Sequence, residues 1–137
     1  MIVLDTHVLV WAVEDDPRLG EMTRQLIEQE STGVRVLVPA ISLWEIAMLV
    51  AKNRLALGQN VRSWIDNVLG LQGVEVAEML PHISLDAVAL PGSFHPDPAD
   101  RMIVATARFH QATLVTADRQ ILDYAAQGHL IAQDAQK

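Results

Sequence analysis

The chain has 137 residues, with ten basic and seventeen acidic side chains, a formal net charge of −7 and no cysteine. The length and the hydrophobic half of the composition favour one domain, residues 1–137, with a real core. The absence of cysteine excludes a disulfide scaffold, a thiolate metal site and a cysteine nucleophile, and fits a reducing, cytoplasmic location. The acidic charge disfavours a module that grips nucleic acid through phosphate contacts alone.

Membrane and export signals are not expected in this sequence. No stretch is apolar for the roughly 18 residues that a membrane span needs. The apolar start of the chain is interrupted by Asp5 and His7, and it has neither a basic region nor a small-residue cleavage site.

Short apolar strands alternate with amphipathic helices along the chain. In chain order, the first half predicts a strand at 1–4, helices at 6–13 and 18–30, a strand at 34–38, and helices at 42–54 and 61–71. The second half predicts a strand at 74–76, helices at 84–90 and 98–111, a strand at 113–116, a helix at 118–126, and an edge strand at 130–131. This alternation is typical of a three-layer α/β/α sandwich with a mainly parallel sheet of four to five strands. The polar tail, from about residue 132, is expected to fray.

Four acidic residues are expected at one edge of that sheet. Asp5 ends the first strand and Asp118 follows the strand at 113–116, and sites in open α/β sheets form beyond the carboxyl ends of strands. Glu45 and Asp100 are predicted in first turns of helices, where the backbone dipole favours a charged carboxylate. Such oxygen ligands suit hard cations such as Mg²⁺ or Mn²⁺ better than zinc.

Each of these acids also has a purely structural interpretation. Asp5 and Asp118 are good N-caps for the helices that follow them. Ser42 and Glu45 have the spacing of a capping box, in which the glutamate only returns a hydrogen bond. The segment 97–100 has the form of a helix start, with an aspartate cap followed by proline. No acid is decisive alone, and the metal site rests on their predicted proximity.

Four sequence blocks occur in order along nearly the whole chain: D-T-H-V-L-V-W from Asp5, S-L-W-E-I from Ser42, D-P-A-D-R-M-I-V-A-T-A from Asp97, and L-V-T-A-D from Leu114. Together they resemble the PIN domain family, and within it the VapC-type toxins of toxin–antitoxin pairs. The first block alone would be a weak signal, whereas four blocks in register are a specific one.

This resemblance implies a metal-dependent endoribonuclease that uses one or two Mg²⁺ or Mn²⁺ ions and leaves a 5′-phosphate and a 3′-hydroxyl. It carries the catalytic, metal-binding acids over to four positions: Asp5, Glu45, Asp100 and Asp118. Thr6 matches a small hydroxyl residue after the first acid, and Thr116 a polar position before the last. Asp97 is left as a cap or supporting residue. The resemblance also implies an RNA substrate, a cognate antitoxin and a homodimer, with residues 43–71 as our candidate interface.

The basic residues near these blocks leave two interpretations open. Arg101 and Arg119 directly follow proposed ligands, where they could steer a phosphate or balance surplus carboxylate charge. Lys52, Arg54 and Arg62 form either a modest RNA-facing patch or a solvated helix end.

The histidines and tryptophans are expected to have mainly structural roles. His7 should pack against its apolar helix, and His95 should serve the loop, although its position would also allow contact with substrate. Trp11, Trp44 and Trp64 fall on apolar helix faces, where core or interface packing is the ordinary role.

Two rival functions have less support. A phosphatase would need a phosphate-binding lysine, and neither Lys52 nor Lys137 follows a strand. A non-catalytic module could receive a basic peptide in an acidic groove. A cationic antitoxin side chain could enter the same groove, so this binding is compatible with a nuclease.

Overall fold

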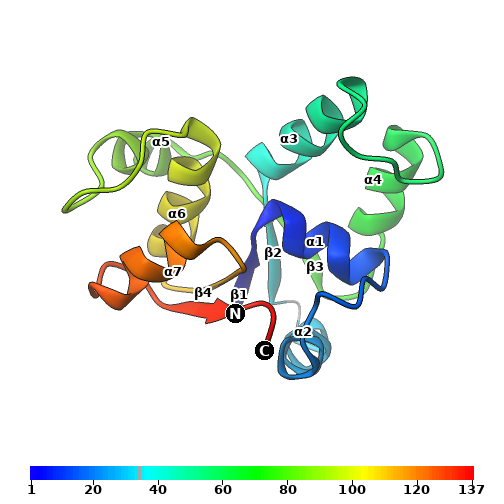
Figure 1. Ribbon diagram of the computed structural model, residues 1–137, viewed down its shortest axis with the longest axis horizontal. Coiled ribbons are helices and arrows are strands. Elements are labelled where there is room, and N and C mark those ends of the chain that lie inside the picture. The colour runs from blue at the N-terminus through cyan, green and yellow to red at the C-terminus, as the bar shows by residue number, and fades with distance from the viewer. Residues whose placement is uncertain (34) are drawn as a thin grey trace.

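Five short strands form one sheet at the centre of the molecule, in the computed structural model that describes residues 1–33 and 35–137. The strands are β1 (Ile2–Leu4), β2 (Val36–Pro39), β3 (Val74–Ala77), β4 (Thr113–Thr116) and β5 (Ala132–Asp134). Their order is β3-β2-β1-β4-β5, and every neighbouring pair is parallel (Figure 1). The predicted parallel α/β sheet of four to five strands is confirmed.

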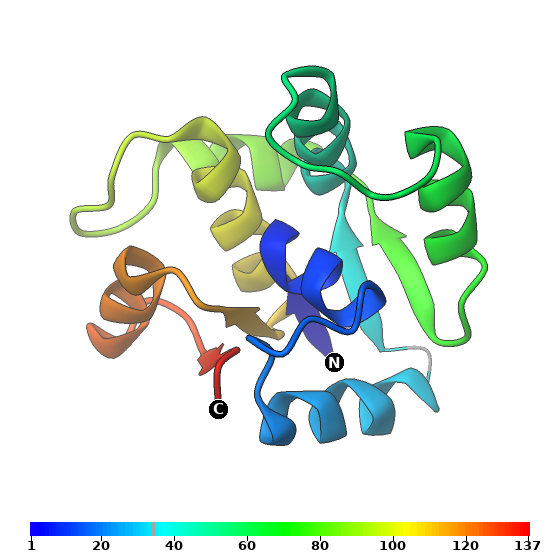
Figure 2. The same ribbon diagram turned by 45° about the vertical axis from the view of Figure 1, so that its right-hand side comes forward.

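Helices cover both faces of this sheet (Figures 1 and 2). They are α1 (Thr6–Val13), α2 (Glu21–Ser31), α3 (Ala40–Ala51), α4 (Val61–Leu69), α5 (Pro81–Val88), α6 (Pro98–His110) and α7 (Arg119–Ala126). Within the described residues, none of the helices has the length and apolar character required to cross a bilayer.

The two faces arise from the alternation of side chains along each strand. Ile2 and Leu4 join a buried cluster with α1, α3 and α4, whereas Val3 between them joins the cluster with α5, α6 and α7. On β4, Leu114 and Val115 divide in the same way between the two clusters. The α/β/α layering predicted from the sequence follows from this two-residue period.

The strand order places a switch point at the centre of the sheet. From β1 the sheet extends through β2 and β3 on one side and through β4 and β5 on the other. Leu4 pairs with Val115, and the Asp5 N–H donates to the Val115 carbonyl at 3.0 Å. The residues that follow β1 and β4 therefore emerge side by side, in the crevice where open α/β proteins place their sites.

The C-terminal segment differs from its prediction. The edge strand lies at Ala132–Asp134, not at 130–131, and the tail does not fray. Ala135 is buried, and its carbonyl accepts a hydrogen bond from the Gly20 N–H at 2.8 Å. A Cβ at position 20 would lie 2.0 Å from the Lys137 carbonyl oxygen, so glycine is needed for this close approach. Main-chain pairing orders the tail despite its polar composition.

Two helices begin at positions other than those predicted. Helix α2 begins at Glu21 rather than at Arg18, whose backbone N–H and guanidinium both bind the Asp16 carboxylate. Helix α3 begins at Ala40, directly after β2. Ser42 is therefore not its N-cap, and the capping-box interpretation is wrong. Glu45 lies beyond the first turn, where it cannot return a hydrogen bond to an N-cap.

The other predicted boundaries of helices and strands differ less from those in the structure. The predicted strand at 34–38 begins at Val36, and position 34 lies outside the described residues. Helix α5 begins at Pro81, three residues before the prediction, because proline occupies its first turn. Helix α4 ends at Leu69, and Gly70 is its C-cap.

Candidate metal centre

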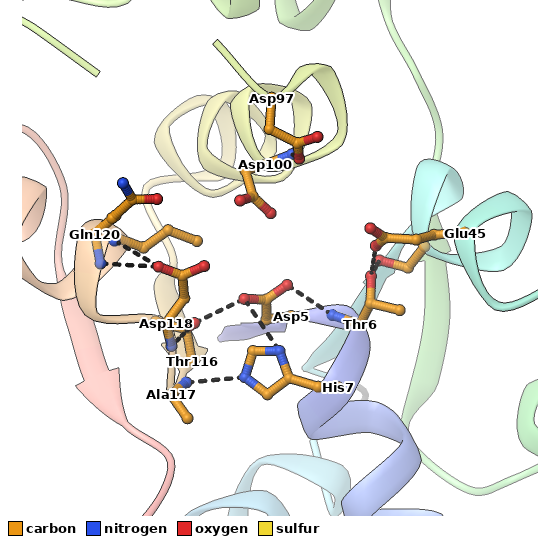
Figure 3. Close-up of polar contacts among 12 residues, drawn as sticks. Asp5, Thr6, His7, Glu45, Asp97, Asp100, Thr116, Ala117, Asp118 and Gln120 are labelled. Carbon is orange, nitrogen blue, oxygen red and sulfur yellow. Dashed lines mark hydrogen bonds and ion pairs between the residues drawn. The ribbon is translucent and has the colours of Figure 1, made fainter. Parts of the chain in front are cut away.

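One cavity of about 270 Å³ is lined by all four acids proposed from the sequence: Asp5, Glu45, Asp100 and Asp118. They come from the end of β1, from α3, from the first turn of α6 and from the start of α7. Figure 3 shows the four carboxylates pointing toward a common space between these elements. The structure therefore brings together side chains that lie far apart in the sequence.

Asp5 is held on both of its oxygens although only 3% of the residue is exposed. Its Oδ1 accepts the Thr6 N–H at 2.8 Å, which caps α1, and its Oδ2 accepts the Thr116 hydroxyl at 2.7 Å. These donors offset the desolvation of a buried carboxylate. The Asp5 side chain therefore caps α1 and faces the cavity at the same time.

His7 makes a polar link that the sequence analysis did not predict. Its Nε2 accepts the Ala117 N–H at 3.0 Å, so the proton of the neutral imidazole must be on Nδ1. Nδ1 lies 3.7 Å from Asp5 Oδ2 (Figure 3). The ring packs against Trp11 as expected, with the two ring centres 5.0 Å apart, and in addition it ties α1 to the segment after β4.

Thr116 joins Asp5 to Asp118 through one hydroxyl group. It donates to Asp5 and accepts the Asp118 N–H at 3.0 Å. Asp118 Oδ1 in turn accepts the N–H groups of Gln120 and Ile121, as the predicted N-cap of α7. Figure 3 shows the carboxylate of Asp118 at the edge of the same space as that of Asp5.

A short hydrogen-bonded chain positions Glu45. The Thr6 Oγ1 lies 2.5 Å from Glu45 Oε1 and 2.9 Å from the Ser42 Oγ. A hydroxyl has one proton, and a carboxylate oxygen is the stronger acceptor, so Thr6 donates to Glu45 and Ser42 donates to Thr6. Ser42 is fully buried. The capping-box spacing predicted only a cap at Ser42 and gave no sign of this role.

Asp97 is the N-cap of α6, as predicted. Its Oδ2 accepts the Asp100 N–H at 3.0 Å, and Pro98 occupies the first turn of the helix. This cap fixes the start of α6 and thereby the position from which Asp100 enters the cavity.

Burial and mutual repulsion act on the two helix-borne acids. Burial raises the pKa of Asp100 to about 7, with further contributions from the negative charges of Asp5, Asp97, Asp118 and Glu45. Burial also raises the pKa of Glu45, the Thr6 hydrogen bond opposes the shift, and the charges of Asp5 and Asp97 add to it. A divalent cation among the carboxylates would relieve this repulsion, and the all-oxygen carboxylate set suits a hard cation. The residues therefore fit a divalent metal ion.

Arg101 is placed differently from both of its predicted roles. Its guanidinium donates to the carbonyl oxygens of Ala87 at 2.7 Å, Phe94 at 3.0 Å, Val88 at 3.2 Å and His95 at 3.3 Å. These bonds tie the end of α5 to the loop before α6, so the side chain neither balances a carboxylate nor is free to steer a phosphate. Arg119 is exposed, and its role remains a prediction.

The outer part of the cavity wall is mixed aromatic and basic. Trp11 and Arg54 line it, and the Arg18 guanidinium lies 4.8 Å from the centre of the Trp11 ring. Trp64 is 1% exposed and packs in the core as predicted, whereas Trp44 is 57% exposed in one copy of the chain, so interface packing stays a prediction for it. Lys52 and Arg62 are exposed at helix ends.

Fold and site together define a parallel α/β protein with a carboxylate cluster, at the sheet's switch point, that fits a divalent cation. The PIN domain family model matches residues 2–127, and the chain belongs to this family. Ribonuclease VapC22 of Mycobacterium tuberculosis is 38% identical over 120 residues, which are 88% of each chain. The predicted resemblance to PIN domains of the VapC type is confirmed.

Solved structures of toxin–antitoxin proteins share the fold. VapBC2 from Rickettsia felis, solved bound to a DNA fragment from its promoter, has a TM-score of 0.71 at 20% identity, covering 97% of this chain and 98% of that one. FitAcB from Neisseria gonorrhoeae has a TM-score of 0.67 at 19% identity, covering 98% of both chains. At this level of identity the likeness shows the fold.

Proposed function

We propose that this protein is a VapC-type ribonuclease, the toxin of a toxin–antitoxin pair, which hydrolyses RNA phosphodiester bonds. The observation that carries the proposal is the convergence of four carboxylates in one cavity, in a chain that is 38% identical to a named VapC ribonuclease.

Three of the acids are proposed to hold the cation. Asp5, Asp100 and Asp118 would bind one or two Mg²⁺ or Mn²⁺ ions, which supply an activated water and neutralise charge that builds on the phosphate. Hydrogen bonds from Thr6 and Thr116 hold the Asp5 carboxylate in place before any ion arrives. Preformed geometry of this kind lowers the reorganisation needed during the reaction.

Glu45 is proposed to orient the attacking water and accept its proton. Its raised pKa makes it a better base near neutral pH than an exposed glutamate, and Thr6 fixes one carboxylate oxygen. Ligation of a second ion is the alternative role. In either case the cut would leave a 5′-phosphate and a 3′-hydroxyl.

The basic and aromatic wall supports single-stranded RNA as substrate. Arg54 and Trp11 line the same cavity as the acids. An arginine can pair with a phosphate, and an indole can stack on a base. This wall would counter the repulsion between RNA and the net negative chain.

The proposal is tested with Asp5→Asn, using Asp123→Asn as a matched control because Asp123 is exposed on α7 outside the cavity. Purified wild-type protein should cleave RNA only with Mg²⁺ or Mn²⁺. Asp5→Asn should lose cleavage and bind metal more weakly, and Asp123→Asn should keep both. Undiminished metal-dependent cleavage by Asp5→Asn would show the assignment of the site to be wrong.

A protein partner is proposed to block the same cavity. The solved structures with this fold include toxin–antitoxin complexes, and the acids would attract a cationic side chain of an antitoxin. Binding should then weaken with added salt and with neutralisation of the acids. Equal binding to a variant with all four acids replaced by amides would place the contact elsewhere.

A homodimer is proposed through residues 43–71. Trp44 is 57% and Leu71 50% exposed in one copy of the chain, which leaves large apolar side chains without cover. Size-exclusion chromatography with light scattering should give twice the chain mass, and Trp44→Glu should reduce it. A monomeric wild-type protein would contradict this part of the proposal.

A further inference from the structure

The loop before α6 brings a histidine close to one of the four acids, Asp100. The His95 Nε2 lies 3.1 Å from Asp100 Oδ2, and both side chains are 18% exposed. One ligand atom each from His95, Asp100 and Asp118 lies within 4.8 Å of the other two. In the part of the chain that the structure describes, no other histidine or acid completes a group of three at this separation. Asp5 and Glu45 therefore do not belong to the group formed by His95, Asp100 and Asp118.

The spacing of these atoms matches that of ligands on one metal ion. Neighbouring ligands of an octahedral ion with bonds of about 2.1 Å lie about 3.0 Å apart, and opposite ligands about 4.2 Å apart. The 3.1 Å between His95 and Asp100 corresponds to the first value. The other two separations are at most 4.8 Å, so small adjustments of the side chains would bring all three atoms onto one ion.

The nitrogen that faces the acids has an unmet bonding requirement. His95 Nε2 is buried and has no hydrogen-bond partner among the described residues, because its approach to Asp100 has ion-pair distance without hydrogen-bond geometry. Buried polar atoms in proteins nearly always have a partner. A cation shared with Asp100 would supply one.

The ring is held in this position before any ion binds. Arg101 donates to the carbonyl oxygens of Phe94 and of His95 itself. The Phe94 ring lies 4.4 Å from the His95 ring and 4.8 Å from that of Tyr124, which anchors it on α7. Two independent restraints, one on the backbone and one on the ring, therefore orient His95. Preorganisation of a ligand lowers the entropy lost on binding.

We propose that His95, Asp100 and Asp118 form a mixed nitrogen–oxygen cation position that favours Mn²⁺ over Mg²⁺. Imidazole nitrogen suits transition metals, whereas Mg²⁺ prefers oxygen ligands and retained water. His95 is then the residue that sets metal selectivity. The inference rests on the proposed function, since Asp100 and Asp118 also belong to the nuclease site.

The test uses calorimetric titration of the metal-free full chain with Mn²⁺ and, separately, with Mg²⁺. His95→Gln should weaken Mn²⁺ binding by about tenfold or more, a loss typical of a disturbed metal shell, and should change Mg²⁺ binding much less. His82→Gln is the matched control, because His82 is exposed on α5 and outside the cavity. It should leave both affinities unchanged.

A second measurement begins with the wild-type protein. Electron spin-echo spectroscopy of Mn²⁺ bound to the wild-type protein should show coupling to a directly bonded nitrogen. The coupling should persist in His7→Asn, because both ring nitrogens of His7 already face other groups. Absence of nitrogen coupling in the wild-type protein would overturn the inference, as would equal losses of Mn²⁺ and Mg²⁺ affinity in His95→Gln.

The outcomes separate this inference from the proposed function. Nitrogen-coupled Mn²⁺ binding without any RNA cleavage would overturn the nuclease and leave the His95 site standing. If the wild-type protein and a folded His95→Gln both cleave RNA with metal and have the same metal selectivity, the His95 site is overturned and the nuclease stands.

Discussion

The strand-end acids and the helix-borne acids of the cavity are held in different ways. Asp5 and Asp118 accept backbone N–H groups at the starts of α1 and α7, and the Thr116 hydroxyl links the two. Glu45 and Asp100 project from α3 and α6, and burial raises the pKa of both. Backbone and Thr116 hydrogen bonds hold the strand-end acids, whereas burial favours the protonated form of the helix-borne acids, although Thr6 also donates to Glu45.

This difference assigns a separate task to each half. Hydrogen bonds set the positions of Asp5 and Asp118, so these positions should change little when a metal ion binds. The helix-borne acids respond, because a cation must displace a proton from Asp100 at and below about pH 7. The four carboxylates repel one another without a cation, and a bound metal ion would make their proximity favourable. Clusters of this kind are common at functional sites.

Asp100→Asn should abolish cleavage and yet stabilise the metal-free protein. Loss of a ligand carboxylate should lower the rate of RNA cleavage by at least about 100-fold, the upper end of losses seen for residues that merely support ligands. Removing a buried charge among like charges should raise the melting temperature at pH 8. Cleavage assays and thermal unfolding without metal measure the two effects. A lower melting temperature would contradict the strained-charge interpretation of the helix-borne half.

Thr6→Val should weaken catalysis by detaching Glu45. The valine is close to isosteric but cannot donate, so Glu45 loses its hydrogen bond and the buried Ser42 loses its partner. We expect cleavage to fall by about 10- to 100-fold and the free energy of unfolding by about 1–3 kcal/mol. Thr6→Ser keeps the hydroxyl and should keep most of the activity. If serine is as harmful as valine at this position, packing rather than hydrogen bonding is responsible.

Metal affinity should rise with pH and then level off near pH 7. Below that value one proton must leave Asp100 for each ion bound, so affinity should increase about tenfold per pH unit. Calorimetry in buffers of different ionisation enthalpy would count the released protons. A flat profile between pH 5 and pH 7 in those titrations would rule out Asp100 as the proton-holding ligand.

Folding stability should show the opposite trend without metal. The Asp100 carboxyl has an ordinary pKa of 3.8 when unfolded and about 7 when folded, so between these values the folded chain holds the extra proton. The free energy of unfolding contributed by this group therefore falls as the pH rises from about 4 to about 7, and is constant beyond. Asp100→Asn should make the slope of the unfolding free energy against pH shallower, and Glu45, whose pKa burial also raises, should account for part of what is left.

Asp97→Asn should have the smallest effect. Asparagine caps helices as well as aspartate does, so α6 should keep its start. Loss of the charge should lower the pKa of Asp100 and reduce cleavage only a few-fold. Asp97→Ala would also remove the cap, at about 1 kcal/mol. If Asp97→Asn proved more damaging than Asp100→Asn, the assignment of one as cap and the other as ligand would be reversed.

Local sequence patterns located the acids and the strands because these features depend on short-range rules. The short apolar runs I-V-L and V-L-V-P identify buried strands, and the Asp97-Pro98 start identifies α6. The same rules misled at Ser42, whose spacing to Glu45 is that of a capping box although α3 begins two residues earlier. A local pattern shows which hydrogen bonds a residue can make within one helical turn. It does not show which group from a distant part of the sequence lies close enough in the folded chain to bind that residue.

The sequence by itself determined which acids are present and that strand ends place Asp5 and Asp118 at one edge. Only the tertiary structure decided their partners: Ser42 for Thr6, 36 residues apart, and Thr116 for Asp5, 111 residues apart. It also turned Arg101 away from the acids and onto four backbone carbonyls. The physical reason is that a buried donor or acceptor bonds with the nearest suitable group in space, and the parallel sheet brings its strand ends together regardless of their separation in the chain.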